Sequence, residues 1–242
     1  MKFTFTLLIC LLPFQAFSDP LVLLAGLTVE PYIIETGDSG FEVDIVKEAF
    51  ALEGYDVEFG YQPLLRSKYS FKEDHVDGVM TIKKNYPEVQ GSFFSDQYIT
   101  YHNFAITLRS NNLKINIIAD LANTRVFGFQ QASLALGKEF ELMAKENSDY
   151  HELSNQGKQV TMLFLMHTDV IVLDFRIFKY YRNRLTRLPN EPLVTFHNLF
   201  EPSAYRMAFK EDKIRDAFNH GLKVLKESGR YKQIIDSYVE SK

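Results

Sequence analysis

The chain has 242 residues, of which 46% are hydrophobic and 24% charged, and its formal net charge is −4. This is the composition of an ordinary globular protein, and the length suits one or two domains with a substantial core. The acidic balance argues against nucleic acid and against an anionic membrane surface as binding partners.

Residues 1–18, MKFTFTLLICLLPFQAFS, have the features of a secretory leader, because one charge at Lys2 precedes an apolar run too short to span a bilayer comfortably. The small-x-small pattern at 16–18 predicts cleavage after Ser18 and export to the periplasm, with an uncleaved anchor as the alternative. Cleavage removes Lys2 and the only cysteine, Cys10, and leaves 26 basic residues (27 minus 1) against 31 acidic ones, a net charge of −5. A mature chain without thiols suits an oxidising compartment.

Strand and helix patterns alternate in the first part of the mature chain. LVLLAGL (21–27) predicts a buried strand and GFEVDIVKEAFALEG (40–54) an amphipathic helix. DVEFGY (56–61) alternates as a second strand, and VDGVMTI (76–82) predicts a third. The stretch 77–99 as a whole predicts a strand, a polar loop and a further strand that together line a ligand. This succession is typical of a layered α/β domain.

The rest of the chain repeats the scheme and closes with helices. The penultimate helix carries four apolar residues on one face, at Ile214, Phe218, Leu222 and Leu225. Two α/β units followed by a helical tail predict two lobes. The predicted elements are strands at 125–130 and 169–174 and helices at 131–146, 175–185, 211–227 and 230–240.

The usual signatures of catalysis and of metal binding do not appear in the sequence. The six histidines are scattered with no pair at metal-ligand spacing, and the mature chain has no cysteine, so we expect no metal and no cofactor. No G-x-S-x-G stretch is present, and GFQQASLALGK (128–138) lacks the spacing of a phosphate-binding loop. A binding protein is therefore favoured over an enzyme.

Four stretches, taken together and in order, resemble one known family. They are EPYIIETGDSGFEVDIVKEAFALEGYDVEF (30–59), VDGVMT (76–81), FFSDQYI (93–99) and DAFNHGLKVLKESGRYKQIIDSY (216–238). This combination resembles the bacterial extracellular solute-binding proteins of family 3, the amino-acid-type periplasmic binding proteins of ABC importers. The similarity extends over essentially the whole mature chain.

The resemblance implies an α/β protein with the two-lobed type II periplasmic-binding-protein fold. Two crossover strands are expected near Phe104–Leu108 and Tyr205–Phe209. Lobe 1 would comprise 19–104 plus 206–242, and lobe 2 would comprise 105–205. A ligand would lie in the cleft between the lobes, which close on it because only the closed state offers contacts to both sides.

The resemblance also implies where the ligand would be bound. Gln131 and Ser133 lie where a strand of the second lobe meets a helix, whose exposed amides suit an anion, although Ser133 serves equally well as a plain helix cap. Asp174 ends a strand where the family offers a carboxylate to the ligand's amino group. Two of the expected contacts have a structural alternative: Tyr32 would instead be a core residue, and Arg66 would instead be a surface residue. The expected ligand-binding residues are Tyr32, Arg66, Thr81, Gln131, Ser133 and Asp174.

One position departs from the family pattern. Amino-acid binders of the family usually carry an arginine that forks onto the ligand's α-carboxylate, but here the corresponding region reads KKNYPEVQGSFFS (83–95), with Tyr86, Pro87 and Glu88 at the expected place. A lysine does not replace a bidentate guanidinium. We therefore expect weak or no binding of the common amino acids. The expected ligand is either an acid bound in a different orientation or a modified solute, which includes cationic ones.

The leading functional hypothesis is a periplasmic protein that delivers a small polar, amino-acid-like solute to an inner-membrane ABC permease, and that acts as a monomer. A sensory or orphan receptor is a second hypothesis. A dehydratase-like enzyme acting on prephenate-like acids is a third, for which Glu30 is the acid or base that the sequence offers.

Overall fold

A computed structural model describes residues 19–185 and 193–240, so the expected leader lies outside the described residues. The strands are β1 (Leu21–Ala25), β2 (Val57–Tyr61), β3 (Gly78–Ile82), β4 (Phe93–Phe94), β5 (Ile99–Tyr101), β6 (Asn103–Leu108), β7 (Val126–Phe129), β8 (Tyr150–Leu153), β9 (Val170–Asp174), β10 (Val194–His197) and β11 (Ser203–Phe209). The α-helices are α1 (Phe41–Ala51), α2 (Leu64–Ser70), α3 (Ala132–Ala135), α4 (Lys138–Glu146), α5 (Gln156–Phe164), α6 (Phe175–Arg184), α7 (Asp212–Glu227) and α8 (Arg230–Val239). Short 3₁₀ helices are η1 (Pro87–Val89), η2 (Arg109–Asn111) and η3 (Ile118–Leu121).

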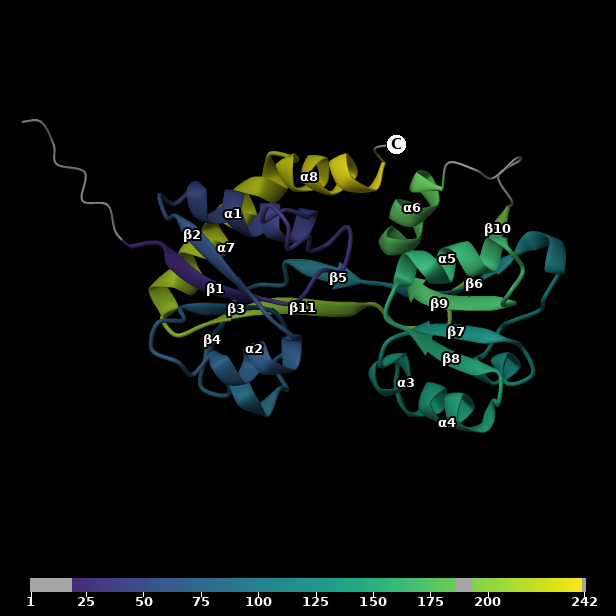
Figure 1. Ribbon diagram of the computed structural model, residues 1–242. Coiled ribbons are helices and arrows are strands. Elements are labelled where there is room, and N and C mark those ends of the chain that lie inside the picture. Colours follow the sequence, from purple (N-terminus) through teal and green to yellow (C-terminus); the bar gives the residue numbers. More distant parts are fainter. Residues whose placement is uncertain (1–18, 186–192, 241–242) are drawn as a thin grey trace, which may run out of the picture.

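The strands form two sheets, one in each of two lobes (Figure 1). The first sheet has the order β2-β1-β3-β11-β4, with β5 also paired to β11, and the second has the order β10-β6-β9-β7-β8. In each sheet the strands that precede helices run parallel: β2, β1 and β3 in the first lobe, and β8, β7 and β9 in the second. Their carboxyl ends point toward the other lobe, as Figure 1 shows, and loops at this end of a parallel sheet are where α/β proteins bind ligands.

The chain passes between the sheets twice. β5 pairs with β11 in the first lobe, whereas β6 pairs with β9 and β10 in the second, so the first passage lies at His102. The return lies between β10 and β11, at 198–202. The expected crossover segments Phe104–Leu108 and Tyr205–Phe209 thus belong to the ordered strands on either side of the two passages.

The two C-terminal helices complete the first lobe. All four residues of the predicted apolar face of α7 are buried, the most exposed being Ile214 at 4%. This face packs against α1, and the contact is so close that a Cβ atom at Gly221 would lie 2.0 Å from the carbonyl oxygen of Ala49. Glycine is therefore required at 221 by packing.

The single helix predicted at 131–146 is wrong, because the chain forms α3 and α4 with a break between them. The break lies at Gly137, whose φ of +97° is a left-handed conformation that glycine adopts without steric cost. α3 is consequently a single turn, and it brings Ser133 close to the carboxyl end of β7. None of the described helices is both long enough and apolar enough to cross a membrane.

Candidate interlobe binding site

The site begins in the first lobe with a bulge at the end of β3. The pairing of β3 with β11 shifts register there, so that Thr81 lies in a bulge with a φ of +58°. A left-handed conformation is rare for a β-branched residue and costs on the order of 1–3 kcal/mol. Two hydrogen bonds hold it: the Thr81 N–H donates to the Tyr98 hydroxyl at 3.1 Å, and Thr81 Oγ1 donates to Glu42 Oε1 at 2.6 Å.

Glu42 is the centre of this region, which we call the first-lobe cluster: Glu42, Thr81, Tyr98 and Tyr101. Its carboxylate also accepts hydrogen bonds from the Tyr98 hydroxyl and, at 3.2 Å, from the Tyr101 hydroxyl. The side chain is completely buried. Burial raises the pKa of Glu42, and the three hydroxyl donors counter only part of that effect.

A stack of two tyrosine rings leads from this cluster to the second lobe. The rings of Tyr101 and Tyr32 lie nearly parallel with their centroids 3.9 Å apart. The Tyr32 hydroxyl then donates to Asp174 Oδ1 at 2.9 Å, although 142 residues separate the two. Two of the predicted site residues, Tyr32 and Asp174, are therefore brought together, and they form a direct hydrogen bond between the lobes.

Asp174 is also the N-cap of α6. Its Oδ1 accepts from the backbone N–H groups of Arg176 at 2.8 Å and Ile177 at 3.2 Å, and its Oδ2 accepts from the N–H of His102 at 2.7 Å. The carboxylate is 1% exposed, and burial raises its pKa despite these donors. Arg176 adds a guanidinium that donates to the carbonyl of Thr100 at 3.1 Å. Asp174 thus ties together α6, the first passage between the lobes and Tyr32.

A second carboxylate lies at the ends of β7 and β8. We call Glu152, Gln131, Ser133 and Tyr150 the second-lobe cluster. Glu152 accepts from the Gln131 N–H at 2.6 Å, the Ser133 N–H at 2.9 Å, Ser133 Oγ at 2.7 Å and the Tyr150 hydroxyl at 2.8 Å. Partial burial alone would raise the pKa of Glu152, but these four donors outweigh it and the pKa is lowered. Gln131 and Ser133 are brought together by a carboxylate that the chain itself supplies.

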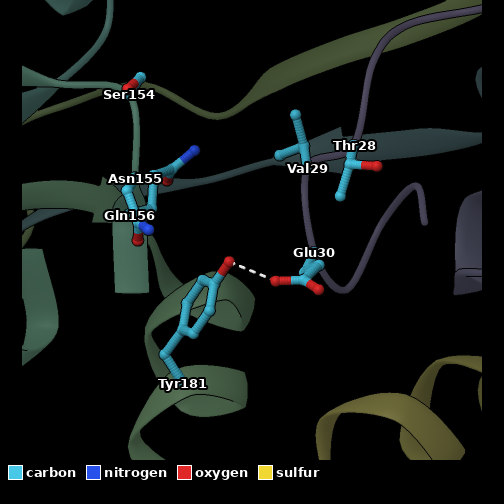
Figure 2. A pocket seen from close by; sticks show the side chains of 7 residues that line it. All are labelled: Thr28, Val29, Glu30, Ser154, Asn155, Gln156 and Tyr181. Atoms are coloured by element: carbon cyan, nitrogen blue, oxygen red, sulfur yellow. Dashed lines mark hydrogen bonds between the residues drawn. The ribbon is translucent and has the colours of Figure 1, made fainter. Parts of the chain in front are cut away.

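A cavity of about 270 Å³ lies between the lobes (Figure 2). Glu30 Oε2 accepts a hydrogen bond from the Tyr181 hydroxyl across it at 2.5 Å, and burial together with this carboxylate raises the pKa of Tyr181. Gln156 contributes a buried side-chain oxygen, Oε1, that has no hydrogen-bond partner in the described part of the chain. The lining comes from the loop after β1, the turn between β8 and α5, and α6: Thr28, Val29, Glu30, Ser154, Asn155, Gln156 and Tyr181.

A family model of bacterial extracellular solute-binding proteins, family 3, matches residues 24–241. The chain belongs to this family. No curated protein matches the sequence. The family predicted from the sequence, and with it the two-lobed type II fold, is confirmed.

Solved structures of the same fold cover nearly the whole chain. The ligand-binding core of GluR0 in complex with L-glutamate is 14% identical with a TM-score of 0.70, covering 92% of this chain and 99% of that one. An ancestral arginine-binding protein bound to arginine is 21% identical with a TM-score of 0.66, covering 91% and 98%. A histidine kinase sensor domain with similarity to periplasmic binding proteins is 17% identical with a TM-score of 0.66, covering 91% and 96%. At these identities the structures establish the fold.

The segment where the family's arginine is expected faces α2 in this solute-binding protein. Glu88 pairs with Lys68 at 3.9 Å, and the Lys68 ammonium lies 3.8 Å from the centre of the Tyr86 ring. Arg66, on α2, is exposed, and no hydrogen bond or ion pair within the described residues joins it to the other five predicted site residues. Lys83 reaches instead toward Ser203 Oγ, 3.4 Å away.

Sequence reasoning missed three charged residues of the site: Glu152, Arg176 and Glu42. Glu152 lies 19 residues after Ser133, a separation with no periodic meaning, and it reaches α3 because β7 and β8 are parallel with Gly128 opposite Glu152. Arg176 follows Asp174 by two residues, a spacing that places both at the start of α6. Glu42 is the third missed residue, although it stands inside the GFEVD block that indicates the family.

Proposed function

We propose that the protein captures a small polar, amino-acid-like solute between its lobes in the periplasm and delivers it, as a monomer, to an ABC permease of the inner membrane. The observation that carries this proposal is the interlobe cavity, whose polar lining is drawn from both lobes. A solute that contacts both linings binds the closed arrangement more tightly than an open one, and so shifts the equilibrium toward closure.

Tyr32 and Asp174 are the proposed grip from opposite lobes. Their hydrogen bond closes the space between the two sheets at one point, and a solute amino group could share the Asp174 carboxylate through Oδ2, which accepts only from His102 among the described contacts. Thr81, Gln131 and Ser133 remain candidates for polar contacts at the strand ends, and Arg66 for a charge at the rim.

The test is a thermal-shift screen against a library of small polar solutes, followed by calorimetry and small-angle scattering on each hit. A ligand present at 100 times its dissociation constant should add about 2.7 kcal/mol to the free energy of unfolding. We expect at least one solute to give saturable binding and a smaller radius of gyration. Binding without compaction would contradict the closure mechanism, and a library without any hit would contradict capture of a polar solute.

A sensory role is the second candidate, and the similarity to a histidine kinase sensor domain favours it. The same binding event would then be passed to a membrane receptor rather than to a permease. Uptake of the identified solute by cells with and without this protein separates the two roles, because only an importer component should be needed for uptake.

Catalysis is not part of the proposal. Glu30, the acid or base considered for a dehydratase-like activity, accepts a hydrogen bond from Tyr181 in the cavity. Incubation of the purified protein with prephenate or arogenate should leave both compounds unchanged, and formation of the dehydrated product would contradict this assignment.

A further inference from the structure

The charge in the lining of the cavity between the lobes is negative. Among the described residues that line it, Glu30 is the only charged one, and no described hydrogen bond uses its Oε1 atom. Arg184, a cation on the same helix as Tyr181, lies outside the lining and stacks on the ring of Tyr180 at 3.5 Å. A group that pairs with the free Glu30 oxygen has to donate a hydrogen bond, and a positive charge on that group would balance the carboxylate.

The donors of the second-lobe cluster, which would suit a solute carboxylate, are already occupied. In the second-lobe cluster the N–H groups of Gln131 and Ser133, together with the Ser133 and Tyr150 hydroxyls, all donate to Glu152. A solute carboxylate at this place would have to displace Glu152 and then lie beside a like charge. On the first lobe, the segment around Glu88 offers no guanidinium in compensation.

We propose that the Glu30 cavity binds the cationic end of the solute, a primary ammonium or a guanidinium, and that the solute carries no carboxylate because Glu152 holds that position itself. This inference rests on the proposed function and narrows its solute class to carboxylate-free cations. Glu30 supplies the counter-charge through its Oε1 atom, and the Tyr181 hydroxyl, which donates to Oε2, fixes the orientation of the Glu30 carboxylate.

Pairs of compounds that differ only in a carboxylate test the inference with the full chain. Agmatine and arginine share a guanidinium, and cadaverine and lysine share a primary ammonium. Calorimetry should show agmatine or cadaverine binding at least about tenfold more tightly than its carboxylated counterpart, since the carboxylate loses its hydration without gaining free donors.

Variants locate the effect. Glu30→Gln keeps an oxygen that accepts from Tyr181 but removes the charge. It should lower the affinity for the amine by about tenfold to a hundredfold. Glu35→Gln, an exposed residue in the same loop and outside the cavity lining, is the matched control and should leave the affinity unchanged. Glu152→Gln should narrow the difference between agmatine and arginine, because the like charge at the second-lobe donors is gone.

The outcomes distinguish this inference from the broader proposal. Failure of both amines to bind, while another solute binds with compaction, overturns the inference and keeps the proposed function. Tight binding of arginine or lysine that is unchanged by Glu30→Gln also overturns the inference and keeps the proposed function. The absence of binding and compaction with every solute overturns both. Unfolding curves of each variant verify that it is folded.

Discussion

Glu42, on α1 of the first lobe, and Glu152, on β8 of the second, each accept hydrogen bonds from the end of a neighbouring strand or the residues that follow it, yet their pKa values move in opposite directions. Each carboxylate accepts a hydrogen bond from a residue in the left-handed conformation. For Glu42 this residue is Thr81, with a φ of +58°, and for Glu152 it is Gln131, with a φ of +65°. The pKa of Glu42 is raised and that of Glu152 is lowered.

The difference lies in exposure and in the kind of donor. Glu42 is completely buried and its donors are three hydroxyls, which can rotate to accept a hydrogen bond from a neutral carboxylic acid. Glu152 is only partly buried, and two of its donors are backbone N–H groups, which can only donate. The first-lobe cluster therefore accommodates a protonated acid, whereas the second-lobe cluster requires an anion. The following predictions test this contrast, from the largest expected effect to the smallest.

Replacement of Glu42 by alanine should have the largest effect. The change leaves three hydroxyls without an acceptor and opens a cavity, so we expect the free energy of unfolding to fall by about 3–5 kcal/mol. Glu42→Gln retains the volume and a neutral acceptor, and should change it by no more than about 1 kcal/mol. Urea unfolding measures both. Equal losses in the two variants would mean that the charge of Glu42 is what the first-lobe cluster needs.

Asp174 links the two lobes and should come next. Asp174→Ala removes the N-cap of α6 and the acceptor of the buried Tyr32 hydroxyl, which together should cost about 2–4 kcal/mol. Asp174→Asn preserves a side-chain acceptor for the cap, so it should lose less. Tyr32→Phe serves as a control, because it deletes the hydrogen bond to Asp174, together with the longer contacts of 3.4 Å to the Thr100 carbonyl and from Arg176, but leaves the cap of α6 intact. Urea unfolding again gives the values, and no destabilisation in Asp174→Ala would refute the capping role.

The second-lobe cluster should be less sensitive to the loss of one donor. Ser133→Ala removes one of four hydrogen bonds to Glu152 at a partly exposed place, and should lower the free energy of unfolding by about 1 kcal/mol. Ser110→Ala, at an exposed position in η2, is the matched control and should be neutral within about 0.5 kcal/mol. A neutral Ser133→Ala would show that the two backbone donors and the Tyr150 hydroxyl are sufficient.

The pH dependence of stability should distinguish the clusters by sign. Because the folded-state pKa of Glu42 lies above its unfolded value, its contribution is fully present below the unfolded pKa and is lost as the pH rises through the folded pKa. The lowered pKa of Glu152 gives the reverse: its contribution is present above the unfolded pKa and is lost as the pH falls through the folded pKa.

Unfolding curves at a series of pH values, for the wild type, Glu42→Gln and Glu152→Gln, measure these contributions. With Glu42→Gln, the free energy of unfolding should fall less than in the wild type as the pH is raised. With Glu152→Gln, it should fall less than in the wild type as the pH is lowered. Difference curves of the same sign for both variants would refute the contrast between hydroxyl and amide donors.

The sequence by itself indicated the family, the strands β1, β2, β3, β7 and β9 and the helices α1, α6, α7 and α8, but it did not locate α2, α5, β8 or β10. Apolar runs located most of these strands, alternation located β2, and the spacing of three and four residues along α7 located its buried face. These patterns are local, because a strand or helix is set by neighbours within a few residues. The break at Gly137 was also missed, since a glycine inside an amphipathic pattern is tolerated in some helices and ends others.

The partners of the charged groups were decided only by the tertiary structure. The resemblance named Tyr32 and Asp174 as ligand contacts, but their hydrogen bond to each other depends on how the two lobes meet. Glu152 finds Ser133 only because β7 and β8 pair in one particular parallel register. A carboxylate can satisfy its hydrogen bonds with any donor that folding brings near, and sequence spacing does not encode which donors those are.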